Sequence, residues 1–130
     1  MVDAELIAAA AEVLRRNYRR TRHTVGAAVR TASGAVFTGV NLEGIHTPCA
    51  EPVAVGAAIS AGESALAAMV AVSRRGPRYS LLPPCGTCRQ LLLDYGPTAY
   101  VLVPDDAGRP VRLTATAALP YPFRTFGRRT

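Results

Sequence analysis

Two short segments, Pro48-Cys49-Ala50-Glu51 and Pro84-Cys85-Gly86-Thr87-Cys88, decide how this chain is organised. Each is predicted to begin a helix after a loop that contains proline. The residues from Cys49 to Ala61 are apolar and rich in alanine, and Gly62 is suited to end that helix. The second helix is predicted over Gly86 to Tyr95, closed by Gly96-Pro97.

Outward from these helices, the pattern of apolar residues and turns predicts the other elements. A first helix is expected over 3–20 and a last short one after Thr114, with loops at 43–48 and 74–83. Strands are expected at 25–31, 35–42, 98–103 and 110–113, and also at 66–73, where length and position favour a buried strand over more helix. The order α-β-β-α-β-α-β-β-α predicts an α/β fold, a three-layer α-β-α domain with a five-stranded mixed sheet.

Length and composition are those of one domain that spans residues 1–130. The chain is 49% apolar but has no uninterrupted apolar run long enough to span a membrane. Its first residues include Asp3 and Glu5 and no basic residue before Arg15, which is unlike a signal peptide. We therefore expect a soluble cytoplasmic protein without a membrane partner.

The net charge is +6, and every basic residue is arginine. Much of the charge falls in two groups, Arg15 to Arg22 and Arg124 to Arg129. The first group reads as a helix end, where cations complement the macrodipole, and the second as a C-terminal tail. We interpret both as solvated surface and expect no nucleic-acid partner, with a nucleic-acid patch as the alternative.

The three cysteines favour a metal site. An odd number in a chain without a secretory signal argues against a disulfide framework. Cys85 and Cys88 share one face of a helical turn, and Cys49 completes a three-thiolate set if the two helix starts are adjacent. Three protein ligands leave the fourth position of a catalytic zinc open. The alternative is that Cys49 is a buried apolar residue and the other two belong to an unrelated metal knuckle.

Glu51 lies two residues beyond Cys49, in the first turn of the helix. From there it does not easily reach the metal as a fourth ligand, but it can reach a water molecule that Zn²⁺ activates. The expected pairing is therefore a Zn²⁺ site with Glu51 as the catalytic proton carrier.

These residues lead to a family. The chain resembles the cytidine deaminase superfamily, whose zinc enzymes have His or Cys in the first ligand position. Because this chain has Cys there, it resembles in particular the small three-cysteine branch. The resemblance is carried by the two cysteine segments, with support at 25–28, 37–43, 89–90 and 119–123. It implies a cytidine-deaminase-like fold, Zn²⁺ as cofactor, and hydrolytic deamination of cytidine or deoxycytidine to the uridine form plus ammonia. It also implies a homotetramer with sites near subunit interfaces.

The resemblance further implies the substrate contacts. Asn41 and Glu43 are expected to hold the ribose 3′-hydroxyl, since alternate residues of a strand share a face. A turn role for Asn41 and a solvated charge for Glu43 are the alternatives. His23 takes the place of an aromatic residue that packs on the base, or is an exposed loop histidine.

Three further roles are expected. Backbone groups around Ala50 and Pro84 would bond the ring carbonyl and the amino group. Phe123 would reach a neighbouring subunit's pocket, or else is ordinary core. Arg89 would offset part of the negative charge of the three thiolates, or is a surface cation.

The chain also departs from cytidine deaminases. The segment from Asn41 to Cys49 is several residues shorter, and Pro52 stands where cytidine deaminases usually carry arginine. Pro52 and Pro48 resemble blasticidin S deaminases instead. His46 lies in the shortened loop, where it is either a substrate contact or a solvated residue.

Four functions follow. The first is deamination of a cytosine nucleoside, and the second is the same reaction on a nucleoside antibiotic such as blasticidin S or on another modified cytosine nucleoside. A nucleic-acid editor is disfavoured because the chain lacks an aromatic-rich basic surface for stacking bases. A zinc-stabilised module without catalysis is the last, and it requires that Glu51 be dispensable.

Overall fold

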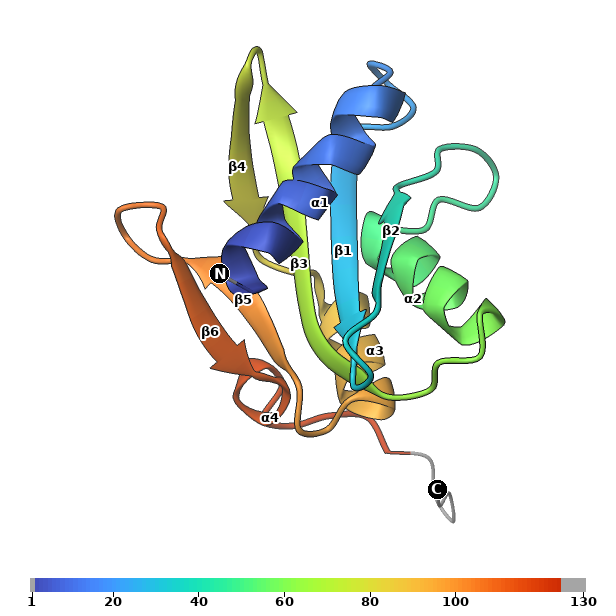
Figure 1. Ribbon diagram of the computed structural model, residues 1–130, viewed down its shortest axis with the longest axis vertical. Helices are drawn as coiled ribbons and strands as arrows, with labels where there is room; N and C mark the ends of the chain where they lie inside the picture. Colours follow the sequence, from blue (N-terminus) through green and yellow to red (C-terminus); the bar gives the residue numbers. More distant parts are fainter. Residues whose placement is uncertain (1, 125–130) are drawn as a thin grey trace.

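The computed structural model describes residues 2–124, and Figure 1 shows the order of the elements along the chain. They are α1 (Val2–Asn17), β1 (Val25–Thr31), β2 (Val36–Val40), α2 (Ala50–Ser60), β3 (Leu66–Arg75), β4 (Arg78–Leu82), α3 (Gly86–Tyr95), β5 (Tyr100–Pro104), β6 (Pro110–Thr114) and α4 (Ala115–Ala118). Of the arginine group predicted at the C-terminus, Arg124 is exposed, and Arg128 and Arg129 lie outside the described residues. Within residues 2–124, no helix is both long enough and apolar enough to cross a bilayer.

The strands form one mixed sheet, in the order β2-β1-β3-β5-β6, with β4 also paired to β3. Only β3 and β5 are parallel. Since β1 takes one edge of β3, β4 and β5 share the other edge, β4 along Ala71–Arg75 and β5 along Ala68–Met69 (Figure 1). The mixed sheet is confirmed, but the expected number of strands is wrong: the sheet has six strands, not five.

The error comes from residues 74–83, which were predicted to be a loop. In the structure, β3 continues to Arg75, the chain turns at Gly76 with a φ of +60°, and β4 runs back antiparallel. Arginines, glycine and proline at the turn hide the hairpin, because they interrupt the apolar pattern that marks a strand. The strand β4 is stabilised by its hydrogen bonds to the buried strand β3 rather than by the strand propensity of its own residues.

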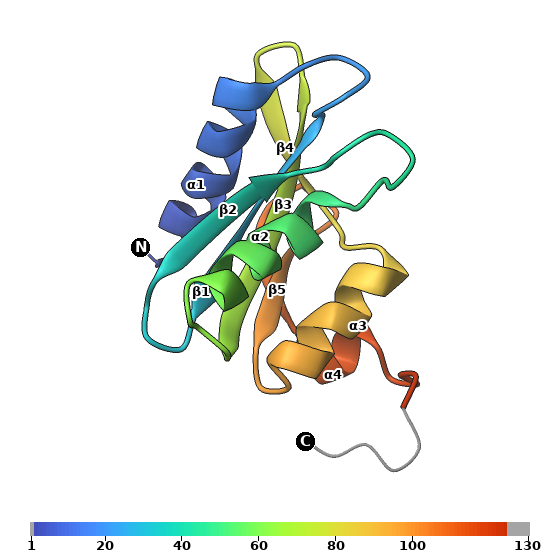
Figure 2. The ribbon, with the colours of Figure 1, turned by 90° about the vertical axis from the view of Figure 1, so that its right-hand side faces the viewer.

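The three layers follow from strict alternation of side chains along the central strands. Ala28, Val70 and Leu102 point to one face and pack against Leu6, Ala10 and Leu14 of α1. Ala27, Val29 and Met69 point to the other face and pack under α2, α3 and α4. Figure 2 shows the sheet edge-on, with α1 on one side and the other helices opposite. The α-β-α layering is therefore as predicted.

The first helix ends before the predicted residue 20. The side-chain amide of Asn17 donates a hydrogen bond from Nδ2 to the carbonyl of Val13, which closes the last turn of the helix. Arg19 and His23 then pair their backbones around a tight turn that holds Thr21 at a φ of +73°. This turn leads directly into β1, so it fixes where the residues before the strand lie.

Two glycines let the helices approach the sheet closely. A Cβ on Gly26 would collide with the carbonyl oxygen of Ala10 in α1, and one on Gly39 would lie 2.7 Å from the backbone nitrogen of Ala54 in α2. Neither contact involves a flexible side-chain end. The helix α2 has Cys49 and Glu51 at its start. Its position against β2 therefore depends on Gly39.

Gly39→Ala is expected to destabilise the protein by about 1–3 kcal/mol, because the added methyl group must push α2 away from β2. Urea unfolding measures the loss, and zinc content reports whether the helix start has shifted. Gly56→Ala is the matched control on the exposed face of α2, where a Cβ meets nothing within 4 Å. That variant should be stabilised by about 0.5–1 kcal/mol. Equal stability of the two variants would mean that the close approach is absent.

A polar cluster fastens α1 to the sheet at its N-terminal end. The Tyr100 hydroxyl donates to Asp3 Oδ1 at 2.6 Å and accepts from Arg30 Nη2 at 2.8 Å. Arg112 Nε donates to Asp3 Oδ2 at 2.8 Å, and its guanidinium lies over the Tyr100 ring. Burial would raise the pKa of Asp3, but the hydrogen bonds from Arg112 and Tyr100 hold it below its ordinary value. The Tyr100 hydroxyl is thus shared by three elements.

Tyr100→Phe should lower the free energy of unfolding by about 1–2 kcal/mol, because Asp3 and Arg30 both lose a part-buried partner. Chemical unfolding at neutral pH measures the difference. Tyr121→Phe is the control, since that side chain is 94% exposed, and it should leave stability unchanged. A Tyr100 variant as stable as wild type would show that the cluster contributes nothing net.

Candidate active site

The starts of α2 and α3 bring the three cysteines together. Cys49 is the N-cap residue of α2 and Cys85 that of α3, both with extended backbone, and Cys88 follows in the first turn of α3. Both N-cap sulfur atoms lie at the positive ends of helix dipoles, which favours the thiolate form and a bound cation's ligand role.

The sulfur atoms are spaced as a bound metal ion requires. Cys49 Sγ lies 3.5 Å from Cys85 Sγ, and Cys85 Sγ lies 3.4 Å from Cys88 Sγ. All three lie within 4.8 Å of one another. A tetrahedral zinc with Zn–S bonds of about 2.3 Å places its sulfur ligands about 3.8 Å apart, so small shifts bring the set into register. The donor set fits Zn²⁺, as predicted.

Burial acts differently on the three thiols. It raises the pKa of Cys88, which is fully buried, and the negative charge of Glu51 raises it further. Burial also raises the pKa of Cys49. At Cys85 the effect of burial is outweighed by hydrogen bonds from the backbone and side chain of Cys88, and the pKa of Cys85 is lowered. A divalent cation favours the thiolate form of all three cysteines, so it counteracts the rise in pKa that burial causes. Metal binding is therefore accompanied by proton release.

Glu51 is a buried carboxyl beside this sulfur cluster. Its side chain is 4% exposed, and burial raises its pKa, against the opposing effect of its own backbone N–H and of the Cys88 thiol. Glu51 lies beside the sulfur atoms because it follows Cys49 by two residues, within the first turn of α2. A carboxyl that is held near a metal and can exist in both protonation states is suited to carry protons.

A cavity of about 350 Å³ opens in front of the cluster. Its lining combines residues from the end of β2, the start of α2 and the segments around β1 and β4: Thr24, Val25, Asn41, Glu43, Thr47, Pro48, Cys49, Ala50, Glu51, Leu82, Pro83 and Cys85. The volume and the mixture of apolar walls with few polar groups are typical of a small-molecule site. Four predicted site residues beyond the metal ligands lie in it: Glu51, Asn41, Glu43 and Ala50.

Asn41 has a structural task within the cavity wall. Its Oδ1 accepts from the backbone nitrogens of Thr24 at 2.8 Å and Val25 at 3.0 Å, which ties the end of β2 to the start of β1. Its Nδ2 donates to Glu43 Oε2 at 3.4 Å. The amide therefore holds Glu43, whose carboxylate is exposed at the cavity. Sugar binding by this pair stays a prediction.

The two histidines lie outside the residues that line the cavity. His23 is half-buried, and its Nδ1 donates to the carbonyl of Asn41 at 2.8 Å when that nitrogen carries the proton. His46 is exposed in the loop between β2 and α2. His23 thus forms a hydrogen bond with the backbone of Asn41, which helps to hold that residue in the cavity wall. Contact of either histidine with a substrate stays a prediction.

Pro84 and Arg89 are joined to each other. Pro84 is buried, and its carbonyl accepts from Arg89 Nε at 2.9 Å, while Arg89 Nη1 donates to the carbonyl of Ala118 at 3.1 Å. Arg89 is therefore not a free surface cation, because it connects the segment before α3 to α4. One lone pair of the Pro84 carbonyl is already used in this bond.

Phe123 lies away from the cavity of its own chain. Gln90 holds its backbone at two points, accepting from Phe123 N at 3.0 Å and donating to Phe123 O at 3.2 Å. The ring remains 75% exposed. Phe123 is thus not ordinary core, and a role in a neighbouring subunit stays a prediction.

Sequence reasoning missed several residues of the cavity wall. Leu82 and Pro83 enter it because β4, predicted as loop, leads there directly. The signal was present as Arg-Tyr-Ser-Leu-Leu ahead of Pro83, a short run with the composition of an edge strand. Thr24 and Thr47 carry no local signal, since only the packing of β1 against the loop before α2 brings them to the site.

Comparison with known proteins agrees with this geometry. The sequence model of the "Cytidine and deoxycytidylate deaminase zinc-binding region" matches residues 1–103. The chain is 36% identical over 132 residues to the blasticidin-S deaminase of Bacillus cereus, covering 93% of this chain and 91% of the relative. It is 41% identical over 96 residues to the cytidine deaminase of Mycobacterium tuberculosis, covering 72% and 68%.

Solved structures show the same architecture. The cytidine deaminase from Burkholderia pseudomallei superimposes with a TM-score of 0.78 at 32% identity, covering 95% of this chain and 100% of that one. That from Mycobacterium tuberculosis gives 0.75 at 35% identity, covering 94% and 97%. The sulfur cluster, the buried Glu51 and these matches agree: the chain belongs to the cytidine and deoxycytidylate deaminase family and is a zinc-dependent deaminase.

Proposed function

We propose that this enzyme hydrolyses the exocyclic amino group of a cytosine nucleoside, with release of ammonia. The observation that carries the proposal is the cluster of three sulfur atoms within 4.8 Å of one another, beside a buried carboxyl and at the wall of a small-molecule cavity. Cytidine and deoxycytidine are the first candidate substrates.

The reaction requires a proton carrier. Cys49, Cys85 and Cys88 would hold Zn²⁺, which would supply the Lewis acidity that makes a water molecule nucleophilic at neutral pH. Glu51 takes one proton of that water to ring N3, which makes C4 electrophilic. The water oxygen bonds to C4, and Glu51 carries the second proton to the amino group as the C4–N bond breaks. The product gains a carbonyl at C4 and a hydrogen on N3, and ammonia leaves.

The rest of the cavity supports a nucleoside substrate. Glu43, held by Asn41, offers acceptors for sugar hydroxyls at the wall of the cavity. The backbone of Ala50, which lines the cavity between Cys49 and Glu51, would bond the base. The carboxylate of Glu43 thus selects for a ligand that presents hydroxyl donors.

A modified nucleoside such as blasticidin S is the second candidate. It is favoured by Pro48 and Pro52 around the first cysteine, by the short loop to Cys49, and by similarity over 93% of this chain to a protein named for that reaction. His46 in the shortened loop would then contact the part of the ligand that extends beyond the base and sugar.

We further propose that the enzyme acts as a homotetramer in the cytoplasm, in pyrimidine salvage. The exposed Phe123 ring, fixed by Gln90 on the backbone, would complete a neighbouring subunit's pocket. A reducing compartment keeps the three thiols available for zinc. Sedimentation of the zinc-loaded protein tests the oligomer.

Ammonia release from cytidine, deoxycytidine, cytosine, blasticidin S and a cytosine-containing single-stranded oligonucleotide tests the function. We expect turnover of the nucleosides in zinc-loaded enzyme and none of the oligonucleotide. Preference for blasticidin S over cytidine would select the second candidate. No ammonia from any nucleoside at one zinc per chain would overturn both.

A further inference from the structure

The fold joins two groups of arginines that are far apart in sequence. The end of α1 with the turn after it and the β3–β4 turn lie at the same end of the molecule (Figure 1). The Arg74 guanidinium lies 3.9 Å from the centre of the Tyr18 ring, and Tyr18 and Tyr79 pack on the same hydrophobic cluster. We call this end the arginine pole; it comprises Arg15, Arg16, Arg19, Arg20, Arg22, Arg74, Arg75 and Arg78.

Almost all of the net charge of the protein is located there. Residues 12–22 and 74–78 hold eight arginines and one acidic residue, Glu12, which gives a charge of +7. The rest of the chain has seven arginines and eight acidic residues, which gives a charge of −1. The net charge of +6 therefore comes from these two segments. The charge is thus a local feature of the surface rather than a property of the whole chain.

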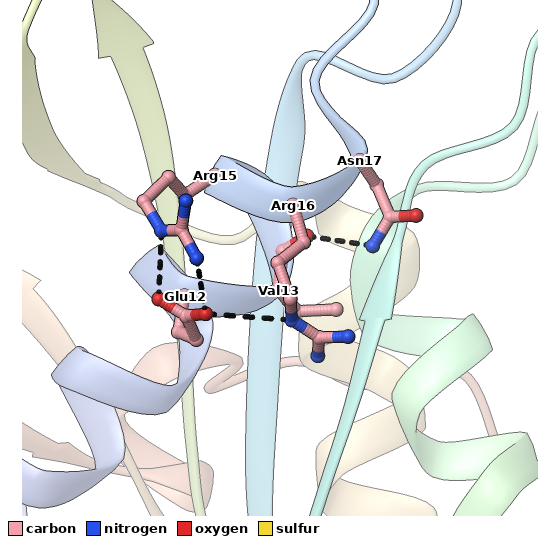
Figure 3. Close-up of polar contacts among 5 residues, drawn as sticks. All are labelled: Glu12, Val13, Arg15, Arg16 and Asn17. Atoms are coloured by element: carbon pink, nitrogen blue, oxygen red, sulfur yellow. Dashed lines mark hydrogen bonds and ion pairs between the residues drawn. The ribbon is translucent and has the colours of Figure 1, made fainter.

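Most of these side chains have no counter-charge. Glu12 is paired with Arg15 at 2.7 Å and with Arg16 at 3.5 Å, and Figure 3 shows both guanidinium groups turned toward its carboxylate. Within residues 2–124, the exposed side chains of Arg19, Arg20, Arg22, Arg75 and Arg78 form no ion pair or hydrogen bond. The negative end of α1 accounts for cations in its last turn, but not for the arginines of the hairpin. Neighbouring like charges that repel one another are stabilised by a bound polyanion.

Against the expectation from the sequence that the protein has no nucleic-acid partner, we propose that the arginine pole binds the phosphate backbone of a polynucleotide, without preference for base sequence. The guanidinium group matches phosphate oxygens in a two-point geometry. Tyr18 and Tyr79 are half-buried, and Arg74 covers Tyr18, so the pole offers backbone contacts rather than base stacking. The exposed large apolar side chains among the described residues lie outside residues 12–22 and 74–78, which disfavours insertion into a lipid surface.

Fluorescence anisotropy with a labelled 20-nucleotide oligoadenylate tests this, because the probe holds no cytosine and is independent of the deaminase site. We expect binding at low salt that weakens as salt rises. The double variant Arg75→Gln/Arg78→Gln should weaken binding roughly tenfold at 0.1 M salt and reduce the slope of log K against log salt by about 1.4, about 0.7 per lost phosphate contact. Circular dichroism checks that each variant is folded.

Arg109→Gln/Arg124→Gln removes the same charge outside the pole and should leave binding within about twofold of wild type, since exposed charges beyond a Debye length are screened. Equal weakening by the two double variants would overturn the proposal, because net charge alone would then explain binding. Absence of binding at 50 mM salt would overturn it too. So would binding to vesicles of phosphatidylserine that the oligoadenylate does not displace, which would assign the pole to a membrane.

Discussion

Glu51→Gln is expected to lower the rate of ammonia release by roughly 10²–10⁴-fold, the usual contribution of a general acid and base. Glutamine keeps the shape of the side chain but has no exchangeable carboxyl proton. Because the group is only 4% exposed, the neutral amide also avoids the cost of burying a charge, and the fold should not be weakened. Product formation by absorbance measures the rate, and elemental analysis measures zinc.

Glu5→Gln makes the same chemical change at an exposed position of α1 and should leave both rate and zinc content unchanged. The assignment of Glu51 as proton carrier requires that zinc stay at one per chain while turnover is lost. If zinc is lost together with turnover, Glu51 acts as a ligand. If more than a tenth of the turnover remains, the proton is carried by another group.

Cys85→Ser should reduce bound zinc well below one per chain and abolish turnover. A serine hydroxyl stays protonated near neutral pH and is a poor ligand for zinc, so only two thiolates would remain. Cys85 is the exposed member of the cluster, whereas Cys88 is fully buried, so this substitution disturbs the packing least. Zinc content after dialysis, and the melting temperature with and without added zinc, measure the effect.

Thr87→Ser is the matched control, since it changes an exposed residue in the same turn, between the two cysteines of α3, and removes no thiol. It should retain zinc and activity. Added zinc should raise the melting temperature of wild type and of this control, but not of Cys85→Ser, because stabilisation follows binding to the folded state. Full zinc occupancy in Cys85→Ser would contradict the three-thiolate site.

Much of the fold could be read from local pattern. The helix of residues 86–95 was predicted with its observed bounds, and Thr114 does cap the last helix through a bond from Ala117 N at 3.1 Å. Both depend on groups close in sequence. The strand β4 was missed because Arg-Arg-Gly-Pro-Arg at the turn interrupts the apolar pattern, so that the short run Arg-Tyr-Ser-Leu-Leu was predicted to be loop although it pairs with β3. Tertiary pairing there overrides propensity.

The sequence by itself determined the chemistry. The spacing of Cys85 and Cys88, and of Cys49 and Glu51, lies within single helical turns, so local geometry alone orders each pair. Only the tertiary structure decided how the pairs meet, with Cys49 Sγ 3.5 Å from Cys85 Sγ. It also decided that Asn41 ties two strands together, that Phe123 does not line the active-site cavity of its own chain, and that separate arginines form one pole. These relations join residues far apart in the chain, and no local preference encodes them, because the packing of α1, α2 and α3 on the sheet creates them.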